Sequence, residues 1–165
     1  MKKAIIISIL ALTVNYSFGQ KHYNQSALDK FIGTWEYSSQ GKDFKVILGK
    51  GNLSMGGVSI DIIQGRHFYS LDNKIIESTL DSTKPSIYNG AIANKEKSLL
   101  KIKFIFNDPI KKREVIGYLE LQQGKMNEAL WTLRNRESVT INAKKTREDF
   151  SFSVPTNIIL HKIDN

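Results

Sequence analysis

The chain has 165 residues, a formal net charge of +8 at neutral pH and no cysteine. The lack of cysteine excludes disulfides, thiolate metal sites and a cysteine nucleophile. It also argues against a lipid anchor, which needs a cysteine at the cleavage point. A chain of this length fits one domain that buries a sizeable core without disulfides.

The N-terminus has the three parts of an export signal. A lysine pair precedes an apolar run over residues 4–14, and the small residues Ser17 and Gly19 precede a cleavage point. We therefore predict a signal peptide over residues 1–19 and a single β-barrel domain over residues 20–165. The apolar run is shorter than the roughly 20 residues that a membrane-spanning helix needs, so no membrane span is expected. The predicted location is the periplasm or the extracellular space, without a lipid anchor.

After the signal, the pattern predicts one short helical element and then strands. Ser26 can cap a helical turn over residues 27–32, which Gly33 would end. From there apolar residues recur at every second position, as in half-buried strands. The predicted strands cover residues 34–38, 44–48, 58–63, 67–71, 74–79, 87–93, 98–106, 113–121, 128–134, 150–154 and 157–163.

These strands are predicted to pair as consecutive hairpins. Residues 40–43 form the turn of the first hairpin, Gly65 divides the second, and Pro85 lies in the connection of the third. The glycine-rich stretch 49–57 is interpreted as a mobile loop, because no helix follows it that could present its dipole to a phosphate.

The hairpin over residues 98–121 has the clearest alternation. Its apolar side chains share one face, while Lys101 and Lys103 lie on the other face with Glu114 and Glu120. Lys–Glu pairs across strands suit a solvated outer face. About ten short strands without βαβ alternation predict an all-β fold, an antiparallel up-and-down β-barrel of about 8–10 strands with a short N-terminal helical turn. Closure removes the sheet edges, and an interior of about eight strands is just filled by side chains or holds one small ligand.

The segment Gly33-Thr34-Trp35 opens the first predicted strand after the helical turn. Together with the meandering hairpins, it resembles the lipocalin and calycin group. The resemblance implies that Trp35 plugs the closed end of the barrel under a basic side chain from a late strand. The structural end plug would then be Gly33, Trp35 and Arg134, with Lys162 as the second choice for the basic residue. The alternative is that Trp35 stacks on a ligand.

Longer stretches carry a second resemblance. The segments IGTWEYSS, FKVIL, LWTLRN and VPTNIILHK, together with the export signal, resemble a family of small secreted proteins of unknown function from Gram-negative bacteria. This resemblance implies a β-barrel-like fold and an exported location. It implies no catalytic or binding residue.

The interior of the barrel is the candidate ligand site. Parity assigns inward positions to the more apolar face of each strand, since a slip by one residue would bury charges. The candidate ligand-binding residues are Trp35, Tyr37, Phe44, Val46, Leu48, Ile102, Phe104, Leu119 and Trp131. They favour an exported barrel that binds a small apolar or amphipathic ligand. A filled barrel that acts through its surface loops is the alternative, and a barrel-mouth enzyme is the third hypothesis.

The sequence predicts no metal site, cofactor or catalytic residue. His22, His67 and His161 are far apart and lack the spacing of metal ligands. Nucleophile elbows, P-loops and dinucleotide fingerprints are absent. The chain is therefore expected not to be an enzyme.

Charged residues are assigned to solvated surfaces. Asp61, Glu77 and Asp81 are interpreted as surface carboxylates rather than as an acid–base pair. The basic clusters 111–113 and 144–147 are interpreted as loops that aid solubility or make weak contact with anionic surfaces. Nucleic acid is not an expected partner, because aromatic residues are not interleaved with these clusters.

Overall fold

The structure is a computed structural model that describes residues 21–23, 26–88, 100–136 and 150–163. The predicted signal peptide and the basic cluster 144–147 lie outside the described residues. Within them, no helix is long and apolar enough to cross a membrane.

The elements follow the predicted order of one short helix and then strands. They are β1 (Lys21–Tyr23), the 3₁₀ helix η1 (Ser26–Phe31), β2 (Gly33–Ser39), β3 (Lys42–Met55), β4 (Val58–Leu71), β5 (Lys74–Ser78), β6 (Ile87–Tyr88), β7 (Lys101–Asp108), β8 (Arg113–Gln122), β9 (Lys125–Arg134) and β10 (Ile158–Ile163).

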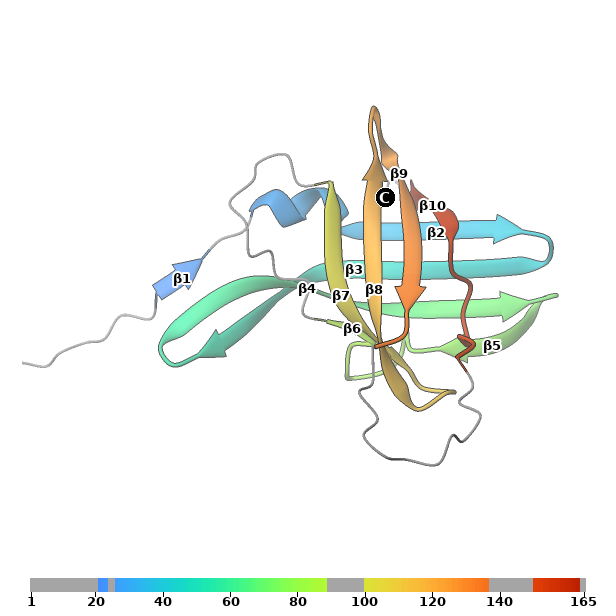
Figure 1. The fold of residues 1–165 in the computed structure, drawn as a ribbon, viewed down its shortest axis with the longest axis horizontal. Helices are drawn as coiled ribbons and strands as arrows, with labels where there is room; N and C mark the ends of the chain where they lie inside the picture. The colour runs from blue at the N-terminus through green and yellow to red at the C-terminus, as the bar shows by residue number, and fades with distance from the viewer. Residues whose placement is uncertain (1–20, 24–25, 89–99, 137–149, 164–165) are drawn as a thin grey trace, which may run out of the picture.

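Eight of the described strands close into an antiparallel barrel, which confirms the predicted fold class. β2, β3, β4, β6, β7, β8, β9 and β10 are neighbours in chain order, and β10 pairs back onto β2. The barrel is therefore of the up-and-down type. β5 and β1 pair with β4 outside this closed path. In Figure 1, β2, β3 and β4 run horizontally, and β7, β8 and β9 run vertically.

The predicted alternation of the 98–121 hairpin is confirmed. Ile102, Phe104 and Phe106 are buried on β7, and the exposed lysines alternate with them. Lys101 lies opposite Glu120 in the register, and their charged groups are 2.7 Å apart. This face of the barrel is solvated, as the pattern indicated.

The second predicted hairpin is wrong. Residues 58–63 and 67–71 belong to one continuous strand, β4, which pairs along its whole length with β3. Gly65 does not break β4, because it pairs with Leu48 within the continuous ladder and leaves room for the β3 backbone. A Cβ at Gly65 would lie 2.5 Å from the carbonyl oxygen of Ile47. The predicted loop 49–57 is also wrong, since β3 continues through it to Met55.

Two further strand predictions need correction. β5 pairs with β4 rather than with the strand that follows it, and β6 pairs with β7. Residues 150–154 form no strand. Their polar groups bond to side chains instead: the Ser153 N–H donates to Asp108, and the Phe150 carbonyl accepts from the Asn135 amide. Side-chain partners here take the place of a ladder.

The far half of the β3–β4 hairpin leaves the barrel as an arm, defined by residues 49–64. β2 pairs with β3 only as far as Leu48. Beyond that point, β1 pairs with β4. Among the described strands, none pairs with the other edge of β3 there. Figure 1 shows this hairpin extending past the barrel on the side where β1 lies.

Candidate functional site

One part of the barrel is closed by η1 and Trp35. The indole is fully buried, and its Nε1–H donates to the Phe31 carbonyl at 2.9 Å. Lys162 Nζ lies 5.5 Å from the centroid of the indole and donates to the Lys30 carbonyl at 3.2 Å. The last carbonyls of η1 thus receive donors from two barrel strands, which satisfies groups that a helix end leaves open.

The basic residue over Trp35 is Lys162, and the assignment of Arg134 to the end plug is wrong. Lys162 lies opposite Trp35 in the register and shares the parity of buried Leu160. Arg134 follows buried Leu133, so it points outward and its guanidinium lies 5.7 Å from the Tyr118 ring.

Gly33 occupies the mouth of β2 with a φ of 127°, which favours glycine. A Cβ there would lie 2.9 Å from Cε of Lys162. The close approach is therefore to the lysine that covers the indole.

The structure places the candidate lumen residues inside the barrel. All but Tyr37 are at most 2% exposed and belong to one hydrophobic core, while Tyr37 is half-buried and packs against that core. The buried members are Trp35, Phe44, Val46, Leu48, Ile102, Phe104, Leu119 and Trp131.

Aromatic rings from opposite walls meet in the middle of the barrel. Phe44 on β3 contacts Trp131 on β9 at a centroid distance of 5.4 Å, and Trp131 contacts Phe106 on β7 at 5.8 Å. Phe106 lies 4.8 Å from the His67 ring on β4, and His67 lies 6.3 Å from Phe44. These residues form a closed circuit across the lumen, the aromatic quartet of Phe44, Trp131, Phe106 and His67. Side chains therefore occupy the cross-section at this level.

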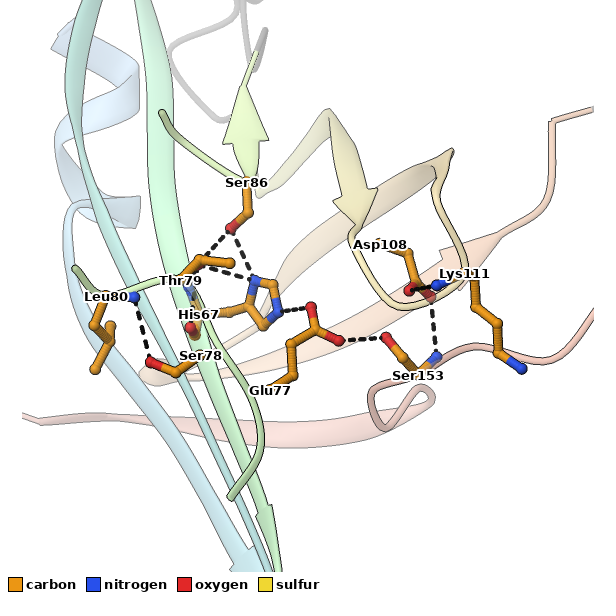
Figure 2. Close-up of polar contacts among 9 residues, drawn as sticks. All are labelled: His67, Glu77, Ser78, Thr79, Leu80, Ser86, Asp108, Lys111 and Ser153. Carbon is orange, nitrogen blue, oxygen red and sulfur yellow. Dashed lines mark hydrogen bonds and ion pairs between the residues drawn. The ribbon is translucent and has the colours of Figure 1, made fainter. Parts of the chain in front are cut away.

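His67 also anchors a buried polar network (Figure 2). The side chain is fully buried, with Nδ1 2.8 Å from the Ser86 hydroxyl and Nε2 2.5 Å from Glu77 Oε1. With its proton on Nε2, the imidazole donates to the carboxylate and accepts from the serine. This order of groups is that of a nucleophile, base and orienting acid. Ser86 is only 3% exposed, however, and Glu77 only 6%.

The network continues from Glu77 to the C-terminal segment (Figure 2). The Ser153 hydroxyl donates to Glu77 Oε2 at 2.7 Å, and the Ser153 N–H donates to Asp108 Oδ2 at 3.0 Å. Asp108 Oδ1 accepts from the Lys111 N–H at 2.8 Å. The chain of bonds therefore ties β4 and β5 to the turn between β7 and β8.

This network lies at the seam between β4 and β6, where the register has one pair, Gly65 with Ile87. The Ser86 N–H donates to the Gly65 carbonyl at 2.9 Å. The backbone of His67 bonds to Thr79, whose hydroxyl accepts from the His67 N–H and whose own N–H donates to the His67 carbonyl, each at 2.9 Å. Side-chain and turn groups here complete a ladder that strand pairing leaves short.

The sequence does not reveal this network, because its members are far apart in the chain. The prediction of a surface carboxylate at Glu77 is wrong, since both Glu77 and His67 are buried. His67 has the parity of buried Tyr69, and that signal was available. Asp61 is also buried, at 8% exposure, whereas Asp81 is exposed as predicted.

Arg113 is not part of a free basic cluster. It begins β8, donates to the Ser151 carbonyl, and holds its guanidinium 5.6 Å from the Phe152 ring. The turn beside it contributes Lys111 and Lys112, so only these two residues of the predicted cluster 111–113 lie in a turn.

Two tyrosines of the barrel have a pKa above its ordinary value. Burial, with a hydrogen bond donated to Glu114, raises the pKa of Tyr88 to about 12. Burial also raises the pKa of Tyr69 above its ordinary value. At neutral pH both phenols therefore act as neutral groups.

The described residues contain no group of three or more histidines and carboxylates that could hold a metal ion. His161 lies on β10 opposite Glu36, away from His67. His22 lies on β1, and its side chain is outside the description.

Residues 1–163 match a family of unknown function, DUF6705. No curated protein and no solved structure matches the chain.

Proposed function

We propose that this chain, which belongs to the DUF6705 family, is an exported binding protein whose barrel is a filled scaffold and whose recognition surface lies outside the lumen. The aromatic quartet carries this proposal. Its rings touch across the interior, so they occupy the space that a lumen ligand would need.

A lumen ligand would have to move buried side chains. Burying a phenylalanine side chain stabilises a fold by roughly 1.5–3 kcal/mol, and a ligand must offset that loss before it gains affinity. The displaced His67 would also lose its buried hydrogen bonds to Glu77 and Ser86, which adds a further cost. The proposal therefore favours the filled barrel over a barrel that binds an apolar or amphipathic ligand.

The end plug supports a kinship with the lipocalin and calycin group as part of the same proposal. Trp35 lies at the start of the first barrel strand under a cation from the last strand, as that resemblance implies. Fold kinship does not specify a ligand, so it adds nothing on the site of recognition.

Export belongs to the proposal because of the signal-like pattern of residues 1–19. The exported chain would begin at Gln20, and its basic residues, including Lys111 and Lys112, would favour weak contact with anionic surfaces. The intact mass of the protein from the periplasm or medium tests this. A main species that begins at Met1 in those fractions would contradict it.

A hydrolase is the second candidate, because Ser86, His67 and Glu77 have the order of a catalytic relay. We favour a structural role, since the relay is buried among the quartet and anchors the seam. A fluorophosphonate, which labels activated serines, distinguishes the two. We expect no change of mass on treatment. A single adduct that is lost in Ser86→Ala, with the variant folded, would support the enzyme instead.

Native mass spectrometry of the protein from its own host, followed by titration with cis-parinaric acid, tests the main proposal. We expect the bare chain without a small apolar molecule, and no saturable quenching of tryptophan at micromolar probe. A saturable response that Ile102→Glu abolishes in a folded variant would place a ligand in the lumen and overturn the proposal.

A further inference from the structure

The outer wall of the barrel carries a groove of about 510 Å³, within the usual size of small-ligand sites. Its floor is the outward face of β2, β3 and β4. Two cross-strand rows form it: Glu36, Lys45 and Phe68 in one, and Ser38, Asp43 and Ser70 in the other. Outward positions on a barrel wall are ordinarily polar, so a phenylalanine in the middle of this face needs a reason.

Apolar side chains form one side of the groove. Phe68 is half-buried, Leu80 flanks it from the connection after β5, and Ile75 on β5 is 62% exposed. The connection is held against the wall by Arg66, whose Nε–H donates to the Ser82 carbonyl at 2.8 Å. The apolar side is therefore a fixed part of the fold.

Oriented carboxylates form the other side. Asp43 accepts from the Ser38 hydroxyl at 2.6 Å and from the Ser70 hydroxyl at 3.3 Å. Glu36 pairs with Lys45 at 2.7 Å. Carboxylates held in this way keep lone pairs for further donors, since an ionised carboxylate accepts about four hydrogen bonds.

We propose that this groove binds a saccharide, an inference that rests on the proposed function and names its ligand class. A pyranose ring has an apolar C–H face that can lie on Phe68 and a rim of hydroxyls that can donate to Asp43 and Glu36. The exposed Ile75 and the half-buried Leu80 extend the platform, so more than one sugar unit can be accommodated.

Other ligand classes fit the groove less well. An acyl chain would desolvate Asp43 without giving it a donor. An anion would meet two carboxylates. A cation would meet the ammonium of Lys45, which lines the groove and already pairs with Glu36. A neutral ligand that donates hydrogen bonds avoids all three conflicts.

Titration of the ¹⁵N-labelled exported domain with cellohexaose, maltohexaose and chitohexaose tests the inference. We expect at least one of these probes to shift amides of β2, β3 and β4 saturably, with a dissociation constant on the order of 1 mM. Phe68→Ala should weaken that binding at least tenfold. Asp43→Asn, which keeps the side-chain shape, should also weaken it if Phe68→Ala unfolds the wall.

Tyr118→Ala is the matched control, because Tyr118 is an outward, half-buried ring on β8, away from the groove. It should bind like the unaltered domain. No shift with any probe, shifts on another face, or unchanged binding by both groove variants would overturn the inference. A saturable shift of the same amides by tetramethylammonium would assign a cation site and overturn it too. In these cases the proposed function stands, since only a lumen response to cis-parinaric acid contradicts it.

Discussion

The two halves of the β3–β4 hairpin differ in how much of β3 they bury, although one alternation runs through both. In the barrel half, Phe44 and Val46 point inward and are at most 1% exposed. In the arm, the positions of the same parity are polar: Lys50, Asn52 and Ser54. The apolar side chains that β3 contributes to the arm stand on the other face, where Leu53 is 44% exposed and Met55 79%.

This difference shows that alternation defines two faces of a strand, and that a face is buried only where an opposing wall covers it. Inside the barrel, the inward face of β3 meets β9 through the Phe44–Trp131 contact. On the arm, the hydrogen bonds of the polar face stay local, as in the 2.5 Å bond from Ser59 to Asn52. A two-stranded hairpin is only marginally stable alone, and the arm adds to it only the three residues of β1, so the arm depends on its continuity with the barrel. Stability should therefore be concentrated in one half of a single hairpin.

The largest expected effect is that of Phe44→Ala in the barrel half. The substitution removes a buried ring that contacts Trp131, His67 and Tyr69, so it opens a cavity in the core. We expect a loss of about 3–5 kcal/mol in the free energy of unfolding. Chemical denaturation of the exported domain measures it, and a loss below about 1 kcal/mol would contradict a filled lumen.

Glu77→Ala should have the next largest effect, since it removes the centre of the polar network. It removes the carboxylate that bonds to Nε2 of the buried His67 and to the Ser153 hydroxyl. We expect a loss of about 3 kcal/mol, because an unpaired buried polar group costs about 1–3 kcal/mol and more when it carries charge.

Glu36→Ala is the control for the network, since it breaks a half-exposed ion pair with Lys45. Exposed pairs contribute about 0–1 kcal/mol, so the denaturation midpoint should move little. Equal losses in the two variants would mean that the network does not anchor the seam.

Two glycines, Gly65 in the barrel half and Gly51 in the arm, allow a finer comparison of how tightly the two halves are packed. Gly65→Ala places a Cβ 2.5 Å from a backbone oxygen of β3, and the strands must move apart. We expect a loss of about 2 kcal/mol, typical of overpacking. Gly51→Ala on the arm meets only the side chain of Gln64, at 2.8 Å, which is long and can turn away.

The Gly51→Ala variant should change the free energy of unfolding by less than about 0.5 kcal/mol. Thermal unfolding of both variants provides the comparison. A loss in Gly51→Ala as large as that in Gly65→Ala would show that the arm is packed as tightly as the barrel.

The sequence predicts the barrel well because alternation is a local signal. The hairpin of β7 and β8 and the inward parity of Phe44, Ile102 and Trp131 follow from it. What it missed depends on contacts between distant residues. The Glu77–Ser153 bond joins residues far apart in the chain, and the choice of Lys162 over Arg134 requires the register of β10 against β2. The loop predicted over residues 49–57 is wrong because its glycines hide the end of β3, which the pairing with β4 completes.

High pH should weaken the barrel half without any substitution. Burial raises the pKa of Tyr88 to about 12 in the folded state, above the ordinary value of 10. Between these values the unfolded chain loses its proton first, so stability present below pH 10 is lost as the pH rises toward 12. We expect the midpoint of urea unfolding to fall more steeply over this range than in Tyr88→Phe. Parallel curves for the two proteins would contradict the role of burial at Tyr88.

Met55→Ala should have the smallest effect on stability, although it removes three heavy atoms and Gly65→Ala adds only one. Met55 lies at the end of β3, and its side chain is mostly in solvent, so truncation removes little surface from contact with the protein. Substitutions at such positions usually change stability by no more than about 0.5 kcal/mol. Paired denaturation curves of Met55→Ala and Phe44→Ala, two sites on one strand, measure the contrast directly. If Met55→Ala cost more than about 1 kcal/mol, the outward face of the arm would have to be covered in solution. The arm half of β3 would then be buried like the barrel half, and the distinction between barrel and arm would fail.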